Sequence, residues 1–372
     1  MKGKQGLVCM GLLLVLSSCS CHTGKQITAS GLQRKDFQTE VNGQHTDLFT
    51  LSNKQGMEVC ITNYGARVVS ILVPDRNGKR EDVVCGFSTI TEYMEQRQNF
   101  GSTVGRYIGR ILNARFTLDG VEYKLVPNNG KSGHISHGGN PGFADRIWKV
   151  EQADTHRVRL SYLSPDGENG FPGNLKVTLV YSLGEDDNAL DLTYEATTDA
   201  PTVLNLSHHS FFNISGNFTK SVEDQQLWVD ADRFTPYDDK KCVTGEYLPV
   251  AGTPLDFRMP HTIGECIDAD HPQLKVVNGY DHTWELNTKG DDTRPAAWVY
   301  DLASGRKMEI FTTEPGMQIY TGNGLKGKMT GKGGIAYPFR SAVCFETMHF
   351  QDSPNQPGFP STVLRPGEVF RS

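Results

Sequence analysis

Apolar and polar residues alternate along much of the chain. The alternation is clearest at residues 57–61, 157–162 and 176–181, and each stretch is about one strand long. Successive side chains of a strand point to opposite faces, so a period of two predicts strands with one buried and one solvated face. The pattern therefore predicts a chain built mainly of antiparallel sheet.

Turn signals separate these predicted strands. Dipeptides suited to tight hairpins, which need residues that accept positive φ, lie at Asn77-Gly78, Asp119-Gly120 and Ser304-Gly305. The chain holds 39 glycines and 18 prolines, so many short loops are expected. Strands spaced this regularly favour an all-β fold in which stacked antiparallel sheets form a large β-sandwich.

A sustained helical period is almost absent. The best helix candidate runs from Thr89 to Arg97, where Ser88 or Thr89 can cap the first turn together with Glu92. We find no internal repeat and no linker rich in proline, glycine and serine that divides the chain. Residues 32–372 are therefore predicted to form a single domain.

The N-terminal residues resemble a bacterial export signal. Lys2 and Lys4 precede an apolar stretch at residues 7–16, which is too short to span a bilayer and ends in Leu-Ser-Ser-Cys at Cys19. This layout predicts a lipoprotein signal peptide at residues 1–18, with lipid carried by Cys19. An ordinary secretory signal with an incidental Cys19 is the alternative.

The lipoprotein interpretation carries further expectations. Residues 19–31 are polar and patternless, so they are predicted to be a tether between the anchor and the folded domain. The protein would be exported and anchored to a bacterial membrane, facing the periplasm, with the lipid as its only membrane contact.

Charge and cysteine content narrow the function classes. The formal net charge is −6, with 37 basic and 43 acidic side chains, which argues against a nucleic-acid partner. Five cysteines follow the anchor region, and none are spaced as C-x-x-C. They are expected to be small buried hydrophobic residues, with room for one disulfide but no zinc site.

Four patches place titratable residues among glycines and aromatics. They lie at residues 105–111 (Gly-Arg-Tyr-Ile-Gly-Arg-Ile), 134–139 (His-Ile-Ser-His-Gly-Gly), 205–213 (Asn-Leu-Ser-His-His-Ser-Phe-Phe-Asn), and 279–282 with 344–347 (Gly-Tyr-Asp-His and Cys-Phe-Glu-Thr). Each alone has an ordinary structural explanation, such as a turn arginine or a solvated glutamate on a strand. Their order and spacing together are more specific.

In that order and at these spacings, the patches resemble the signature of the aldose 1-epimerase family. The resemblance covers the chain from about Thr50 to its C-terminus, and residues 116–120, 314–323 and 352–356 support it. It implies a large β-sandwich of the galactose mutarotase-like (supersandwich) kind. It also implies an isomerase that interconverts the α and β anomers of free aldohexoses such as galactose and glucose, with no metal and no cofactor.

The resemblance assigns roles to six residues. His209 stands where the family has its general acid, and Glu346 stands where it has its general base. The positions that bind sugar in the family are matched by Arg110, His137, Asp281 and Gln318. A nearby carboxylate, either Asp281 or Glu346, is expected to keep His209 protonated near neutral pH.

The chemistry supports these roles independently. Opening a cyclic hemiacetal requires loss of the C1 hydroxyl proton and gain of a proton at the ring oxygen. A carboxylate and a protonated imidazole on opposite sides of the bond can perform both transfers. The arginine fork and the two carboxylate oxygens of Asp281 suit a ligand rich in hydroxyls.

Some residues depart from the family pattern or allow two interpretations. Gly109 replaces the asparagine that commonly precedes Arg110, which leaves sugar preference open. The interval from Arg110 to His137 is slightly long, so His134 is the alternative to His137. The phenylalanines Phe211 and Phe212 suit either a platform for one face of the sugar or packing in the core. His208, where the family commonly has asparagine, is interpreted as structural.

Three other functions compete. A glycosidase would use Asp281 and Glu346 as its carboxylate pair. A sugar-binding lipoprotein without catalysis would need neither His209 nor Glu346 to transfer protons. A phosphorylated hexose is a poor fit, because Arg106 and Arg110 are the only obvious cations near the motifs.

Overall fold

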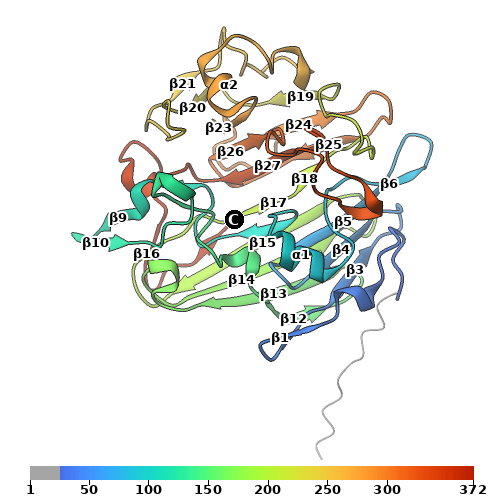
Figure 1. The fold of residues 1–372 in the computed structure, drawn as a ribbon, viewed down its shortest axis with the longest axis horizontal. Helices are drawn as coiled ribbons and strands as arrows, with labels where there is room; N and C mark the ends of the chain where they lie inside the picture. The colour runs from blue at the N-terminus through green and yellow to red at the C-terminus, as the bar shows by residue number, and fades with distance from the viewer. Residues whose placement is uncertain (1–25) are drawn as a thin grey trace, which may run out of the picture.

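The computed structural model describes residues 26–372, which form strands, loops and a few short helices (Figure 1). The predicted signal peptide, Cys19 and residues 20–25 of the predicted tether lie outside the described residues. Residues 26–31 of that tether are bonded to the folded body. The amide of Ala29 donates to Glu58 Oε1 over 2.7 Å, and the Ser30 hydroxyl lies 3.0 Å from that of Ser70.

Two sheets enclose the first core. A five-stranded antiparallel sheet has the order β12-β13-β14-β15-β29 and a four-stranded sheet has the order β3-β4-β5-β6. Their apolar faces meet in one cluster that includes Val59, Val68, Leu160 and Leu179. The bounds are β3 Leu48–Ser52, β4 Glu58–Thr62, β5 Arg67–Pro74, β6 Arg80–Asp82, β12 Lys149–Ala153, β13 Arg157–Ser164, β14 Leu175–Leu183, β15 Leu190–Thr198 and β29 Phe370–Arg371.

Two further sheets enclose a second core. A six-stranded sheet has the order β18-β27-β26-β23-β20-β21, and a four-stranded sheet has the order β22-β19-β24-β25. Leu227 and Val299 of the smaller sheet pack against Trp284 and Ile319 of the larger one. The bounds are β18 Phe211–Phe212, β19 Gln226–Val229, β20 Arg233–Thr235, β21 Leu248–Pro249, β22 His261–Thr262, β23 Asp281–Glu285, β24 Ala297–Tyr300, β25 Lys307–Ile310, β26 Gly316–Tyr320 and β27 Val343–Met348.

The remaining strands form short two-stranded ribbons. Together with the four larger sheets they confirm the predicted antiparallel sandwich. The ribbons pair β1 with β2, β9 with β10, β8 with β11, β16 with β28, and β7 with β17. Their bounds are β1 Glu40–Val41, β2 Gln44–His45, β7 Ser102–Val104, β8 Arg110–Ile111, β9 Arg115–Leu118, β10 Val121–Lys124, β11 Ile135–Ser136, β16 Thr202–Val203, β17 Ser207–His209 and β28 Val363–Leu364.

Local signals in the sequence are mostly confirmed. The three dipeptides connect β5 to β6, β9 to β10 and β24 to β25, and their glycines have φ between +75° and +80°. Helix α1, Ile90–Gln96, is capped by Thr89, whose hydroxyl accepts from the Glu92 amide while the Glu92 carboxylate accepts from the Thr89 amide. The prediction that 57–61 is half-exposed is wrong, because β4 is buried on both faces.

The second face of β4 is covered by the N-terminal residues. Val59 and Ile61 point into the first sandwich core, whereas Cys60 packs in a separate cluster with Leu32 and Phe37. The alternation therefore marked two different apolar environments rather than a core and a solvent face. Helix α2, Pro272–Val277, was not predicted from the sequence. Neither α-helix of residues 26–372 is long and apolar enough to cross a membrane.

Candidate active site

Three of the six predicted site residues come from neighbouring strands of the six-stranded sheet. Asp281 lies on β23, Gln318 on β26 and Glu346 on β27, and Gln318 stands directly opposite Glu346 in the ladder. Alternate residues of these strands, such as Ile319 and Phe345, point into the second core. The period of two thus sends Asp281, Gln318 and Glu346 to the opposite face, and we call these three residues the sheet wall.

The other three predicted residues come from short ribbons and a loop. Arg110 lies on β8, His209 lies on β17, and His137 directly follows β11. His137 has φ +52°, and its amide donates to the Gly109 carbonyl over 2.9 Å. The His137 ring lines the same cavity as the sheet wall and packs edge-on against the ring of His209, with the two ring centroids 5.5 Å apart. We call Arg110, His137 and His209 the loop wall.

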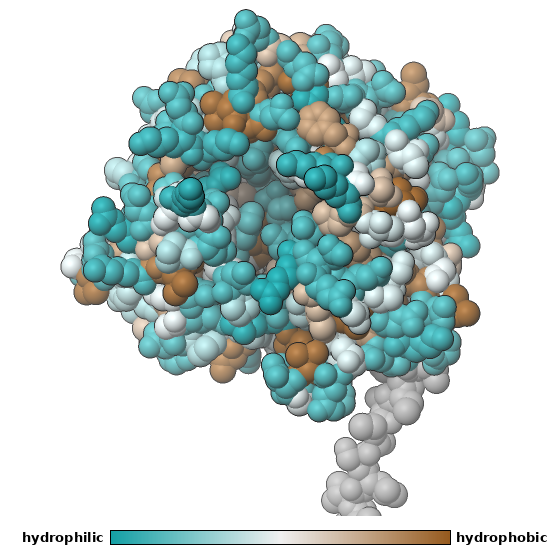
Figure 2. Space-filling view, in the orientation of Figure 1, coloured by the Kyte–Doolittle hydropathy of each residue, from teal (hydrophilic) through white to brown (hydrophobic). Residues whose placement is uncertain are grey.

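Both walls line one cavity of about 260 Å³. The cavity contains all six predicted residues, and it is also lined by Gln98, Asn99, Gly109, Ser136, Phe211, Tyr320, Met348 and Gln351. The space-filling view shows a hollow near the centre of this face, bordered mainly by hydrophilic residues (Figure 2). Polar lining of this kind suits a ligand that presents many hydroxyls.

The alternatives that the sequence left open are resolved by position. His134 does not line the cavity, because its ring is held by the Asn113 amide at 2.9 Å and by the Cys242 sulfur at 3.2 Å. His208 bonds to the Ser210 hydroxyl over 2.6 Å and lies on the other side of β17, in agreement with a structural role.

Of the two phenylalanines at 211–212, one lies where a sugar platform would be and the other packs in the core. Phe211 lines the cavity, and its ring centroid lies 5.2 Å from that of His209. Phe212 instead packs against Phe345 and the two sandwich cores.

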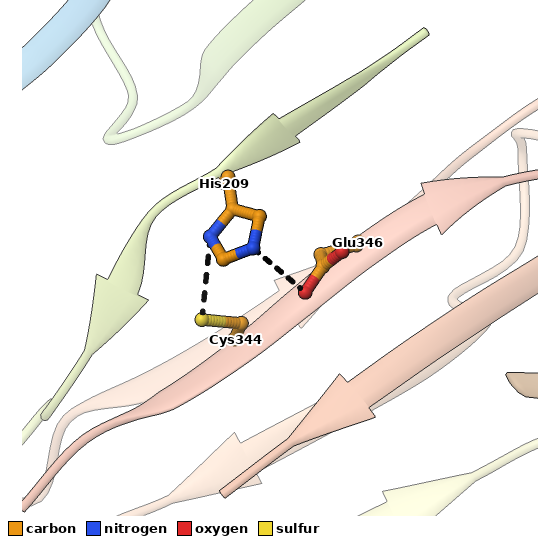
Figure 3. Close-up of side chains that lie close together, drawn as sticks. All are labelled: His209, Cys344 and Glu346. Atoms are coloured by element: carbon orange, nitrogen blue, oxygen red, sulfur yellow. Dashed lines mark hydrogen bonds and ion pairs between the residues drawn. The ribbon is translucent and has the colours of Figure 1, made fainter. Parts of the chain in front are cut away.

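His209 and Glu346 form the central contact of the site. His209 Nε2 lies 3.4 Å from Glu346 Oε1, and the two residues are 6 % and 4 % exposed (Figure 3). On the other side of the imidazole, Nδ1 lies 3.8 Å from the sulfur of Cys344, which is two residues before Glu346 on β27. One strand, β27, therefore supplies the partners of both ring nitrogens.

Burial sets the protonation of this pair. Removal from water, with a smaller contribution from the nearby Arg67 guanidinium, lowers the pKa of His209 to about 4. Burial also raises the pKa of Glu346 well above its ordinary value, with the Asp281 carboxylate acting in the same direction. Both directions run against the expectation that a carboxylate keeps His209 protonated near neutral pH. Both shifts favour the form of the pair in which the imidazole is neutral and the single proton lies on the Glu346 carboxyl.

Cys344 orients the imidazole. Burial raises the pKa of its thiol well above the ordinary value, so the sulfur keeps its hydrogen. The sulfur lies beside Nδ1, so this contact fixes the orientation of the ring and leaves Nε2 as the atom that faces Glu346. His209, Cys344 and Glu346 also offer ligand atoms that lie within 4.8 Å of one another, a set that could hold a metal ion. The absence of a metal from the reaction stays a prediction.

The rest of the sheet wall is held by a buried hydrogen-bond network. Thr283 donates to Gln318 Oε1 over 2.5 Å, and Gln318 Nε2 donates to Asp281 Oδ1 over 2.6 Å. Burial raises the pKa of Asp281, while Arg110 and the bond from Gln318 oppose that rise. Tyr237 and Gln351 join the network through their own bonds to Gln318.

Sequence reasoning missed Tyr237 and Gln351. Both lie outside regular strands, where no period reveals which way a side chain points. Gln351 directly precedes the matching segment 352–356, which was the single available signal. Gln98 and Asn99 were also missed, although they follow the predicted helix.

Comparison with known proteins agrees with this geometry. The family model for aldose 1-epimerase matches residues 47–372. The chain is 39% identical to galactose mutarotase of Sus scrofa over 87% of this chain and 91% of that protein. It is 36% identical to aldose 1-epimerase of Escherichia coli K12 over 89% of this chain and 94% of that protein.

Solved structures give the same result. An aldose epimerase homologue from C. elegans has a TM-score of 0.80 and 30% identity, and covers 88% of this chain and 96% of its own. Galactose 1-epimerase from Lactobacillus acidophilus has a TM-score of 0.77 and 28% identity, over 90% of this chain and 95% of its own.

The sequence, the fold and these relatives converge on one interpretation. The matched region contains both walls of the cavity, and the relatives named above are isomerases rather than glycosidases or lectins. The chain therefore belongs to the aldose 1-epimerase family, and it is a carbohydrate isomerase that interconverts the α and β anomers of aldoses.

Proposed function

We propose that this protein interconverts the anomers of free aldohexoses, glucose and galactose, with His209 as general acid and Glu346 as general base. The observation that carries the proposal is the 3.4 Å contact between His209 Nε2 and Glu346 Oε1 inside the polar cavity. The name of the Sus scrofa relative, galactose mutarotase, supports galactose as one of the sugars.

The single proton of the pair is enough for the reaction. When a sugar enters, transfer of the Glu346 proton to His209 gives a carboxylate and an imidazolium, the two forms that the chemistry needs. Glu346 then takes the C1 hydroxyl proton while His209 donates to the ring oxygen, and the bond between C1 and the ring oxygen opens to an aldehyde. Rotation about C1–C2 presents the other carbonyl face, and the two transfers run in reverse.

Four residues hold the sugar in this proposal. Arg110 and His137 act from the loop wall, and Asp281 and Gln318 act from the sheet wall. Arg110 is the one lysine or arginine among the described residues that line the cavity, which favours a free sugar over a phosphorylated one. A hydroxyl-rich ligand can satisfy donors and acceptors on both walls at once.

Polarimetry tests the proposed chemistry. We expect the purified protein to accelerate the change in optical rotation of freshly dissolved α-D-glucose and α-D-galactose. The variants Glu346→Gln and His209→Asn should each lose about 100- to 10,000-fold in rate, because each removes one proton transfer. A folded protein that binds these sugars without accelerating their mutarotation would exclude the proposal.

We also propose that the protein is an exported lipoprotein, anchored through Cys19 and facing the periplasm. The support is the leader pattern of residues 1–19, and an exported mutarotase would equilibrate sugars that glycan hydrolysis releases as one anomer. Membrane fractionation tests this location. The native chain should sediment with membranes, and Cys19→Ala should appear in the soluble fraction. Equal membrane content of both would exclude Cys19 as the anchor.

A further inference from the structure

One glutamine of the cavity has no role among the residues described so far. Gln351 is 4 % exposed and lines the cavity beside Gly109. A Cβ added at Gly109 would lie 2.6 Å from Cγ of Gln351 and 3.1 Å from its Cδ. Real Cβ atoms do not approach another carbon so closely, so the Gln351 side chain fills the volume that a side chain at position 109 would need.

The surrounding network fixes which way the Gln351 carboxamide faces. The Asp281 carboxylate can only accept, so it requires the nitrogen of Gln318, and the Gln318 oxygen then faces the Thr283 hydroxyl and accepts from it. Gln351 Nε2 then donates to Gln318 Oε1 over 3.3 Å and to the Tyr237 hydroxyl oxygen over 2.7 Å. Both N–H groups of Gln351 are used.

The carbonyl oxygen of Gln351 remains. Among residues 26–372 no hydrogen bond to Gln351 Oε1 is formed. This atom is also not one of the sealed polar atoms that lack a partner, so it is open to the cavity that Gln351 lines. An acceptor held in a fixed direction at the edge of a sugar-sized cavity is complementary to an O–H donor of the ligand.

We propose that Gln351 is a specificity-determining residue whose Oε1 accepts a hydrogen bond from one hydroxyl of the aldose. This inference rests on the proposed function and deepens it, because it adds an acceptor on the Arg110 side of the cavity. Gly109 makes the contact possible, since any larger residue there would displace the glutamine. The sugar preference that the sequence left open at position 109 is therefore set by Gln351.

A double-deletion experiment tests the contact. One partner is changed by Gln351→Met, which keeps the length of the side chain, and the other by 2-, 3-, 4- or 6-deoxyglucose in place of glucose. We expect the variant to lose about three- to tenfold in kcat/KM with glucose, the size of one neutral hydrogen bond. It should lose the same factor with every deoxy sugar except the one that lacks the bonded hydroxyl, for which the loss should be below about twofold. An equal loss for all five sugars would overturn the proposal.

A second variant reaches the same contact from the glycine. Gly109→Ala should reproduce the pattern across sugars seen for Gln351→Met, because its Cβ pushes the glutamine aside. Gly133→Ala is the matched control, since Gly133 has a similar φ of +72° against +76° for Gly109 and open space around its Cβ position. If Gly109→Ala lowers kcat/KM equally for every sugar, Gln351 does not choose among hydroxyls.

Failure of the Gln351 contact can be distinguished from failure of the proposed function. If the native protein accelerates no mutarotation, that function fails, and the same glutamine variant and sugars are compared by titration calorimetry. Sugar-dependent coupling in Kd would still support the Gln351 contact, and its absence would overturn it.

Discussion

The two walls of the cavity face the same ligand but are held in different ways. In the sheet wall, Asp281, Gln318 and Glu346 stand on three paired strands whose other face is buried in the second core. In the loop wall, the ribbons that carry Arg110 and His209 are two and three residues long. The sheet wall is positioned by register, whereas the loop wall depends on close backbone approaches, so single substitutions should affect the two walls differently.

Among substitutions that test how the two walls are held, the largest effect is expected at Gly138, which directly follows His137 of the loop wall. A Cβ at this position would lie 2.0 Å from the Gly105 carbonyl oxygen. Gly138→Ala must therefore shift the backbone beside His137, and a displacement of about 1 Å at a binding residue can cost about 100-fold in rate. The rate is followed by polarimetry, and urea unfolding checks that the variant is folded.

Gly130→Ala provides the control for Gly138→Ala. Gly130 also has positive φ, at +51°, but nothing lies within 4 Å of its Cβ position. This variant carries the backbone strain without the clash and should stay within about threefold of the native rate. Equal rates for the two variants would mean that close approach does not position the loop wall.

The second prediction concerns the sheet wall. Asp281→Asn removes a charged acceptor for the sugar, and we expect a loss of about tenfold to 100-fold in kcat/KM at neutral pH. The pH profile should change as well. The Asp281 carboxylate raises the pKa of Glu346, so its removal lowers that pKa. The pair then loses its proton at a lower pH.

The readout for Asp281→Asn is the alkaline side of the kcat/KM profile, which should move to lower pH. The acid side is set by uptake of a second proton on His209, near its pKa of about 4, and should move less. Asp119→Asn, at an exposed ion pair with Arg365, is the control. An unchanged alkaline side would contradict the coupling between Asp281 and Glu346.

A smaller effect is expected from the residue that joins the two walls. Cys344→Ala removes the sulfur contact to His209 Nδ1 and should lower kcat about three- to tenfold with little change in KM, because the imidazole loses the group that fixes its orientation. Cys344→Ser keeps a hydrogen-bonding group there and should recover part of the loss. Nitrogen-15 shifts of the His209 ring report the tautomer directly, and a serine variant no better than alanine would argue against this positioning role.

The smallest effect is on stability in acid. Burial lowers the pKa of His208 from 6.5 to about 3, so unfolding takes up a proton in this range. The stability that the neutral ring carries is complete above pH 6.5 and is lost as the pH falls toward 3. His208→Asn should therefore lose less unfolding free energy between pH 7 and pH 4 than the native protein.

Urea unfolding at several pH values measures this difference. His45→Asn, at an exposed position, is the control and should follow the native protein. A steeper acid loss in His208→Asn than in the native chain would contradict the pKa direction. The rate of mutarotation should change less than twofold, because His208 does not line the cavity.

The sequence predicted features that depend on near neighbours in the chain, but not contacts between distant residues. Alternation predicted the strands at 157–162 and 176–181, and Thr89 with Glu92 marked a helix start, because these signals depend on near neighbours. The six site positions came from motif order. Gln351 was missed because its contact with Gly109 joins residues far apart in the chain.

The protonation state of the His209–Glu346 pair is the second property that the sequence did not predict. The sequence places a carboxylate and an imidazole in one site, and a charged pair was the natural expectation for His209. What reverses it is the depth of burial, which depends on how the sheets and loops close around the cavity. No local sequence pattern predicts how deeply these two side chains are buried.

The neutral state of the His209–Glu346 pair has a consequence for the conditions under which the protein can work. Dissolved ions screen exposed charges strongly and buried ones weakly. The pair is buried and carries no net charge before the sugar binds. Dissolved salt should therefore change its energy very little. The catalytic rate should therefore be nearly the same in dilute and in concentrated salt, so that changes in salt concentration leave sugar equilibration undisturbed.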